Sequence, residues 1–418
     1  MQSLKGKKLL ILGGPALACD IVEKAREMGV YTIVTDWYEP DKSPAKLIAD
    51  EYAMISTADV DAMADFINKR EIDGVITGFT DSTLKYYQMI CEKAGLPCYA
   101  TKEQIEITTD KVKFKNLCKE FEIPVVEEYK IDDIDKIVFP VLVKPADNSG
   151  ARGISICYDK EQLHNAHNIA LNFSESKKVI IERYIEATEA TIFYTINNGK
   201  IELIGVADRY TKNNQQGVIP LPVAYIFPSK HSKKYKETLD KKAEKMFKSL
   251  EMKNGMIFIQ TFVENDKFIF YEMGYRLTGS LEYKVYERIN GVNSLEQMIN
   301  FALTGKMEQS VKRYDKSLIG CNITLLARPG VIGKIEGVEE LKSANGIIDV
   351  FASYKAGDVI AEKAKGTLMQ VVVRIFATAK TMDALKRLIE LTHNTIKVTS
   401  ANGENMLLDK LNVEEIYE

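Results

Sequence analysis

A lysine at the end of an apolar run is the first feature of the sequence that suggests chemistry. Lys144 follows the run at residues 141–143, and the small residues Ser149 and Gly150 come soon after it. A lysine in this position places an ammonium group at the mouth of a cleft, and small residues let backbone N–H groups approach an anion closely. The segment therefore predicts a binding site for phosphate groups. An ordinary surface turn is the alternative interpretation.

Two glutamates near the next apolar run could contact a nucleoside. Glu182 ends the run at residues 179–181, and Glu189 lies seven positions later (189 − 182 = 7). Carboxylates separated by a strand end and a turn can point into one pocket, where they accept hydrogen bonds from a base amine and from a ribose diol. Without such a pocket, both would be solvated surface groups.

A hairpin predicted at residues 258–272 carries oxygen ligands for a metal ion. Gln260 lies on its first strand and Glu272 on its second, with the turn at residues 264–267 between them. Adjacent antiparallel strands bring such side chains together, and their hard oxygen atoms suit magnesium. Arg276 lies just beyond, where it would hold an anion. An ordinary cross-strand pair with an ion pair nearby is the alternative interpretation.

Arg209 is a weaker candidate for substrate binding. It follows another predicted hairpin, whose turn is Asn198-Gly199, in a segment that could face a substrate. Its planar guanidinium group could bind a carboxylate through two parallel hydrogen bonds. An ordinary surface arginine is an equal alternative.

A motif near the N-terminus imitates a dinucleotide-binding loop. Gly13 and Gly14 follow the first predicted strand, and Asp36 ends the second. The G-x-G-x-x-G pattern nevertheless fails, because Pro15 and Ala18 occupy two of the positions that it reserves for glycine. A nicotinamide-dependent oxidoreductase remains the alternative function that this loop would support.

The elements that must position these residues change character along the chain. Residues 8–102 alternate short apolar strands with amphipathic helices, which predicts right-handed crossovers and a doubly wound parallel α/β domain. From about residue 139, paired strands and hairpin turns predict antiparallel sheets. After about residue 316, short strands around one helix predict a small α+β domain.

Composition excludes several classes of protein. The chain has 418 residues, with 56 Lys and Arg against 59 Asp and Glu and a net charge of −3, so neither nucleic acid nor an anionic membrane is an expected partner. Its apolar runs are far shorter than the roughly 18 residues that span a bilayer. The six cysteines form no CxxC pair, which favours a reducing compartment such as the cytoplasm.

Taken in this order, the motifs resemble those of the ATP-grasp superfamily, in the branch typified by biotin carboxylase, carbamoyl phosphate synthetase and ATP-dependent L-amino acid ligases. The motif Asp110-Lys111-x-x-Phe-Lys resembles the first phosphate contact of the family, and Val-Leu-Val-Lys144-Pro resembles the second. The roles that the resemblance implies are phosphate binding by Lys111, Lys144, Ser149 and Gly150, adenine contact by Glu182 and Tyr184, ribose contact by Glu189, magnesium ligation by Gln260 and Glu272, and a contact of Arg276 with an acyl phosphate.

The resemblance covers essentially the whole chain and implies three parts. They are a pre-ATP-grasp α/β domain at residues 1–105, an ATP-grasp domain at 106–316 and a C-terminal α+β domain at 317–418. A small lobe at about 135–205 would close over the nucleotide and exclude water.

The activity that the resemblance implies is that of a carboxylate–amine ligase with ATP and Mg²⁺ as cofactors. The protein would activate a small carboxylic acid, an amino acid among the candidates, as an acyl phosphate and couple it to an amine. A homodimer is left open. One departure matters, because Gly274 stands where the family has asparagine in Glu-x-Asn-x-Arg, and glycine offers no side-chain ligand to a second magnesium ion. A nucleotide-binding regulatory protein without turnover therefore stays open as well.

Overall fold

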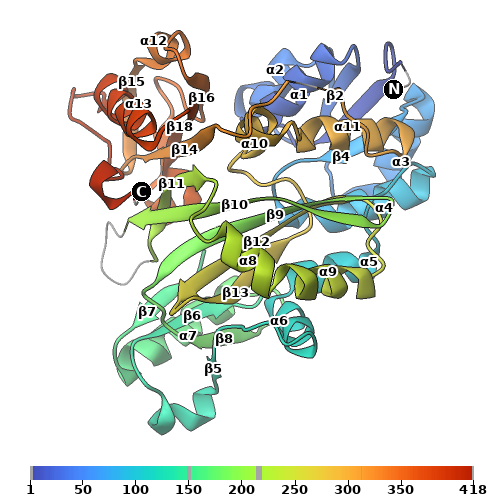
Figure 1. The fold of residues 1–418 in the computed structure, drawn as a ribbon. Coiled ribbons are helices and arrows are strands. Elements are labelled where there is room, and N and C mark those ends of the chain that lie inside the picture. The colour runs from blue at the N-terminus through green and yellow to red at the C-terminus, as the bar shows by residue number, and fades with distance from the viewer. Residues whose placement is uncertain (1–2, 148–151, 213–218, 312, 417–418) are drawn as a thin grey trace.

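Four parallel strands form the N-terminal sheet, in the order β3-β2-β1-β4 (Figure 1). The computed structural model describes residues 3–147, 152–212, 219–311 and 313–416. The strands are β1 (Lys8–Leu12), β2 (Tyr31–Thr35), β3 (Glu51–Ala53) and β4 (Gly74–Thr77), and the helices between and after them are α1 (Ala18–Glu27), α2 (Pro44–Ile48), α3 (Val60–Arg70) and α4 (Leu84–Ala94). The predicted doubly wound parallel arrangement is confirmed.

A helix from far along the chain completes this N-terminal layer. The helix α11 (Ser294–Thr304) packs against β4, and almost all of its residues are buried. Gly74 permits the close approach, since a Cβ atom at this position would lie 2.2 Å from the carbonyl oxygen of Ala302. The N-terminal sheet therefore depends on a segment more than 200 residues later (294 − 77 = 217) for part of its cover.

The small lobe begins after a capped helix. Asp110 caps α6 (Lys111–Glu120) by accepting hydrogen bonds from the N–H groups of Val112 and Lys113, while Thr108 and Thr109 end the preceding α5 (Lys102–Thr109). A four-stranded sheet in the order β5-β8-β6-β7 follows, with its own apolar core. Its elements are β5 (Glu128–Tyr129), β6 (Val141–Pro145), β7 (Ser155–Cys157), α7 (Lys160–Phe173) and β8 (Val179–Arg183).

Eight antiparallel strands form the central sheet, in the order β13-β12-β9-β10-β11-β14-β18-β16. They are β9 (Thr188–Asn197), β10 (Lys200–Lys212), β11 (Leu221–Phe227), β12 (Gly255–Glu264), β13 (Lys267–Gly274), β14 (Ile319–Leu326), β16 (Ile347–Ala352) and β18 (Val371–Ala379). Both predicted hairpins are confirmed. The β9–β10 turn has Asn198 and Gly199 at φ 50° and 77°, and the β12–β13 turn has Asn265 and Asp266 at φ 50° and 61°, the positive values that two-residue hairpins favour.

The central sheet runs without interruption across the boundary predicted near residue 316. Because β14 pairs with β11 and with β18, the C-terminal strands extend the sheet that carries the candidate site residues. The remaining C-terminal elements are β15 (Gly330–Glu336), α12 (Val338–Lys342), β17 (Val359–Ile360), α13 (Met382–Thr395) and β19 (Lys397–Ser400). In Figure 1 they gather at the upper left, away from the small lobe at the bottom.

Helices α8 (Ser232–Thr238), α9 (Asp240–Ser249) and α10 (Tyr283–Asn290) complete the layers around the central sheet. All six cysteines are free thiols. Within the described residues, no helix is long and apolar enough to cross a membrane.

Candidate active site

A cavity of about 1920 Å³ opens where the N-terminal layer, the small lobe, the central sheet and the C-terminal strands meet. Typical small-molecule sites occupy roughly 300–1,000 Å³. The cavity is therefore large enough for a nucleotide and a second ligand together. The predicted site residues that line it are Lys111, Lys144, Glu182, Tyr184, Glu189, Arg209, Gln260, Glu272 and Arg276. Ser149 and Gly150, which the sequence also singled out, lie outside the described residues.

Buried lysines surround Glu182 at the small-lobe side of the cavity. The Oε2 atom of Glu182 lies 2.7 Å from Nζ of Lys144, and its Oε1 atom contacts Nζ of Lys115. Lys115 also lies 2.7 Å from Oε1 of Glu128. Only 3% of Lys144 and 2% of Glu182 are exposed, so these ionic contacts form away from bulk water. Since both carboxylate oxygens of Glu182 contact lysines, the adenine contact predicted for this residue stays a prediction.

Burial and neighbouring charge set the protonation of this cluster. Burial alone would raise the pKa of Glu182, but Lys144 and Lys115 outweigh it and hold that pKa below its usual range. Burial lowers the pKa of Lys144, and the positive charges of Lys115 and Lys111 add to the decrease against the opposing effect of Glu182. Three lysines thus concentrate positive charge beside the cavity, an arrangement that suits the phosphates of a nucleotide.

Lys115 is a site residue that the sequence analysis did not assign. It belongs to the quoted motif, and it follows Lys111 by four positions on α6, a spacing that places both side chains on one face of the helix. This four-residue spacing is the feature of the sequence that could have identified Lys115 as a site residue. Lys111 itself is buried at the start of α6, and its N–H group donates to the carbonyl oxygen of Ala146 directly after β6.

Glu189 lies at the centre of a second polar cluster. Glu189 on β9 lies opposite Arg209 on β10 in the register of the sheet, and the two side chains form an ion pair. The hydroxyl of Tyr271 donates a 2.6 Å hydrogen bond to the same carboxylate. Burial would lower the pKa of Arg209, but the attraction of Glu189 outweighs it and raises this pKa. Binding of the ribose by Glu189 and of a substrate carboxylate by Arg209 both stay predictions.

Gln260 and Glu272 lie directly opposite each other on β12 and β13, as the sequence predicted. Within the described residues, neither side chain makes a hydrogen bond or an ion pair with another residue. Two unengaged oxygen ligands facing a cavity fit a magnesium ion that takes its other ligands from water and phosphate. No cluster of three or more His, Cys, Asp and Glu residues suited to a metal occurs in the part of the chain that the structure describes.

Phe258 explains why position 274 is a glycine. Gly274 lies opposite Phe258 in the β12–β13 register, and a Cβ atom at Gly274 would lie 2.3 Å from the phenyl ring. The same ring lies 5.1 Å from the guanidinium carbon of Arg276, within cation–π range. The phenyl ring of Phe258 thus fills the space that a side chain at position 274 would need, and it packs against the guanidinium group of Arg276.

Asp81 fixes the orientation of Arg276. The Nε and NH2 groups of Arg276 donate to the two carboxylate oxygens of Asp81 at 2.6 and 2.7 Å, and its NH1 group donates to the carbonyl of Leu277 at 3.0 Å. Asp81 begins a short 3-10 helix (Asp81–Thr83) in the loop that follows β4. An arginine carries five N–H donors, so two remain for a ligand. A residue of the N-terminal layer therefore orients an arginine that follows β13.

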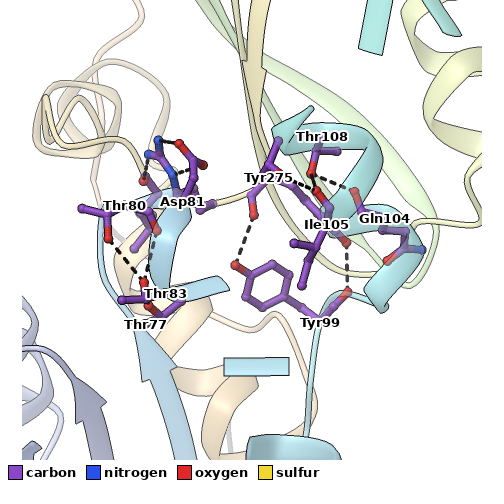
Figure 2. A network of polar contacts seen from close by, with 12 residues as sticks. Thr77, Thr80, Asp81, Thr83, Tyr99, Gln104, Ile105, Thr108 and Tyr275 are labelled. Carbon is purple, nitrogen blue, oxygen red and sulfur yellow. Dashed lines mark hydrogen bonds and ion pairs between the residues drawn. The ribbon is translucent and has the colours of Figure 1, made fainter. Parts of the chain in front are cut away.

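The loop around Asp81 is itself tied down by hydroxyl groups (Figure 2). The hydroxyl of Thr83 contacts that of Thr77 at 2.5 Å and that of Thr80 at 3.3 Å. On the other side, the hydroxyl of Tyr99 donates to the carbonyl oxygen of Tyr275 at 3.1 Å, next to Arg276 in the chain. The two segments that meet at Arg276 are thus held independently of any ligand.

Comparison with known proteins shows which proteins share this fold. Residues 110–310 match the family model described as "Carbamoyl-phosphate synthase L chain, ATP binding domain". The chain superposes on an L-amino acid ligase from Bacillus licheniformis with a TM-score of 0.76 and 17% identity, covering 95% of this chain and 99% of that one. Residues 110–310 are thus similar to this family of ATP-binding domains, and the chain as a whole shares the fold of the ligase. The ATP-grasp fold predicted from the sequence is confirmed.

Further known proteins are similar over much of the chain. The biotin carboxylase domain of the Hydrogenobacter thermophilus 2-oxoglutarate carboxylase, solved with MgADP, ADP and bicarbonate, has a TM-score of 0.75 and 19% identity over 96% of this chain and 91% of that one. The small subunit of that carboxylase is 24% identical over 344 residues, 76% of this chain and 71% of the relative. A formate-dependent phosphoribosylglycinamide formyltransferase from Sulfolobus acidocaldarius is 29% identical over 210 residues, and the match spans 52% of that relative.

The loop after β1 is held by contacts within the N-terminal layer. Asp36 accepts hydrogen bonds from the N–H of Gly14 at 2.9 Å and from the hydroxyl of Ser43 at 2.8 Å, and its other oxygen lies 2.7 Å from Nζ of buried Lys46. A Cβ atom at Gly14 would lie 2.2 Å from the Ser43 hydroxyl oxygen. Both oxygens of Asp36 are thus engaged in stabilising the loop, so the ribose contact on which a nicotinamide site would depend would have to compete with these contacts.

Proposed function

We propose that this chain is an ATP-dependent carboxylate–amine ligase. The observation that carries the proposal is the combination, around one cavity, of buried lysines, a pair of unengaged oxygen ligands and an oriented arginine. Lys111 and Lys144 provide positive charge for phosphates, Gln260 and Glu272 provide the ligands for a cation, and Arg276 keeps two donors for an anion. The family model, named for an ATP-binding domain, supports the same assignment of the cavity.

The proposed reaction has two steps. A carboxylate oxygen attacks the γ-phosphorus of ATP, the bond from this phosphorus to the bridging oxygen breaks, and ADP leaves with an acyl phosphate behind. An amine then attacks the acyl carbon, the bond to phosphate breaks, and an amide forms with loss of a proton. Such reactions rely on positioning and electrostatic stabilisation more than on a protein nucleophile.

Each side chain has a distinct part in this proposal. Lys111 and Lys144 bind the phosphate oxygens and offset their charge, and Glu189 holds the ribose. Gln260 and Glu272 hold magnesium, which when bound neutralises charge on the phosphates. Arg276, with its orientation fixed by Asp81, contacts the acyl phosphate. The small lobe, which has its own apolar core, closes over the cavity and excludes the water that would hydrolyse this intermediate.

The test is a panel of carboxylic acids assayed for ADP release, with hydroxylamine present to trap an acyl phosphate as a hydroxamate. We expect hydroxamate only when ATP, magnesium and a cognate acid are all present. Bicarbonate is included as one acid because relatives of the chain include a carboxylase. Phosphoryl transfer to an alcohol, or ATP binding without any acid-dependent ADP release, would refute the ligase proposal.

A further inference from the structure

Arg374 is a buried arginine at the C-terminal side of the cavity that the proposed reaction does not use. It lies on β18 opposite Thr324 of β14, lines the cavity and is 5% exposed. Its NH1 group donates a 2.8 Å hydrogen bond to the hydroxyl of Thr324. Within the described residues this is its one polar contact, so four of the five N–H donors of the guanidinium group have no protein partner.

The other buried arginines around the cavity are neutralised by carboxylates. Arg276 pairs with Asp81, and Arg209 pairs with Glu189. Arg374 has no carboxylate within ion-pair distance in the described part of the chain, and burial lowers its pKa. Burying a charge without a partner costs free energy of folding. An arginine buried in this way beside a cavity therefore suits the binding of an anionic ligand.

A buried carboxyl group of opposite charge lies near Arg374 without pairing to it. Glu282 is 2% exposed, lines the same cavity and accepts a hydrogen bond from the hydroxyl of Thr278. Burial raises the pKa of Glu282, and the charge of Arg374 is close enough to oppose that shift. Two opposite charges that face one cavity, close to each other but not in contact, match a ligand that carries both an anionic and a cationic group.

This pair lies apart from the lysines that face the phosphates. In the central sheet, three strand steps separate β18 from β10, which carries Arg209, and at about 4.8 Å per step this is roughly 14 Å. Figure 1 likewise shows β18 among the C-terminal elements and β6 and β8 in the small lobe. Thr278, Gly279 and Ser280, which follow Arg276 in the chain, also line the cavity.

We propose that Arg374 and Glu282 bind the amine co-substrate of the ligase and that this co-substrate is an amino acid, with its carboxylate on Arg374 and its ammonium group beside Glu282. The inference rests on the proposed function and adds the chemical class of the amine. A planar guanidinium group with free donors binds a carboxylate through two parallel hydrogen bonds. The Glu282 carboxylate takes one proton from the ammonium group, the neutral amine attacks the acyl carbon, phosphate leaves, and the second proton of nitrogen passes to solvent.

The test compares acceptors that differ only in the carboxylate. With the acid found by the hydroxamate panel, amide formation is measured with the proteinogenic L-amino acids and with the matching amines that lack the carboxylate. The variants are Arg374→Gln, Arg374→Lys and Glu282→Gln, and the control is Arg387→Gln, which changes an exposed arginine on α13. Hydroxamate formation is followed in every variant, because hydroxylamine carries no carboxylate and reports acid activation alone.

We expect wild type to use an amino acid and to reject its decarboxylated partner. Arg374→Gln should raise KM for the amino acid at least about thirtyfold, the change that corresponds to roughly 2 kcal/mol, with hydroxamate formation within about twofold of wild type. Arg374→Lys should recover part of the loss, because lysine keeps the charge without the two-donor geometry. Glu282→Gln should lower the rate of amide formation while hydroxamate formation persists, and Arg387→Gln should change neither reaction.

Three results would overturn the inference. Equal use of an amino acid and its decarboxylated partner would remove the carboxylate from recognition. Unchanged kinetics in Arg374→Gln would remove the arginine from it. A parallel loss of hydroxamate and amide formation in folded Arg374→Gln would assign the arginine to the activated acid instead. Absence of hydroxamate with every acid in wild type would be a different result, since it would refute the ligase proposal on which the inference rests.

Discussion

Replacing Glu182 by glutamine tests whether this carboxylate stabilises the fold by compensating the charges of two buried lysines. Its Oε2 atom lies 2.7 Å from Lys144, its Oε1 atom contacts Lys115, and all three side chains are at least 96% buried. Removing one partner of a buried ion pair costs about 3–5 kcal/mol, because an uncompensated charge remains behind. Glu182→Gln leaves two such charges, with only Glu128 opposite Lys115. We therefore expect the free energy of unfolding to fall by at least about 3 kcal/mol.

The measurement is urea unfolding, followed in wild type, in Glu182→Gln and in the matched control Glu264→Gln. Glu264 pairs with Arg183 near the surface, where an ion pair contributes at most about 1 kcal/mol. Because the phosphates of ATP supply negative charge to the same lysines, a saturating concentration of ATP or inorganic triphosphate should restore part of the unfolding free energy that Glu182→Gln loses. An equal effect of Glu182→Gln and Glu264→Gln, with no response to triphosphate, would refute the structural reasoning.

The difference in unfolding free energy between wild type and Glu182→Gln should change with pH in a definite direction. The pKa of Glu182 is lower in the folded chain than its usual value of 4.5, so the carboxylate stabilises the fold above that pH and loses this contribution as the pH falls through its folded value. The gap in stability between wild type and Glu182→Gln should therefore be full at pH 7 and shrink below about pH 4.5. A gap that widened in acid would contradict the assignment of the lower pKa.

Three further predictions concern the nucleotide and the metal. Lys144→Ala should weaken ATP binding or slow turnover at least about a hundredfold, and isothermal titration and ADP release would measure this; unchanged values would remove the phosphate assignment. Glu272→Gln should reduce magnesium-dependent ADP formation far more than Gln260→Ala, because it removes the charge that anchors the cation; full activity in Glu272→Gln would exclude this hairpin as the metal site. Gly274→Asn should destabilise the chain because of the clash with Phe258. The double variant Phe258→Ala, Gly274→Asn should fold better than Gly274→Asn and bind magnesium more tightly than Phe258→Ala. A well-folded, stable Gly274→Asn single variant would contradict the packing argument.

The parts of this fold that the sequence predicted are those in which the signal is local. Asn198-Gly199 predicts a two-residue hairpin because both positions tolerate positive φ. The turn after β12 likewise brings Gln260 and Glu272 onto adjacent strands, although their direct pairing depends on a register shift between Gln260 and Thr261 that the turn does not predict. Asp110 predicts the start of α6 because its side chain can bind free N–H groups at a helix end. Each of these inferences needs only the neighbouring residues in the chain.

The parts that the sequence did not predict depend on contacts between distant segments. Asp81 and Arg276 are 195 positions apart, and nothing near either residue indicates the other. Lys115 and Glu182 are 67 positions apart, and the residues around Glu182 do not indicate that its carboxylate contacts two lysines. Arg374 lies in an apolar strand whose pattern indicates a buried position but not the adjoining cavity. Pairing of this kind is decided by the tertiary fold.

The contact between α11 and β4 has a consequence for synthesis of the chain on the ribosome. Ser294 follows Thr77 by 217 residues (294 − 77 = 217), and at about 5–20 residues per second the helix leaves the ribosome roughly 10–40 s after the strand that it covers. During that interval the face of β4 around Gly74, which receives Ala302 in the finished protein, has no helix against it. The nascent N-terminal layer thus exposes an apolar surface for many seconds, and it reaches its final packing only when most of the central sheet has already been made.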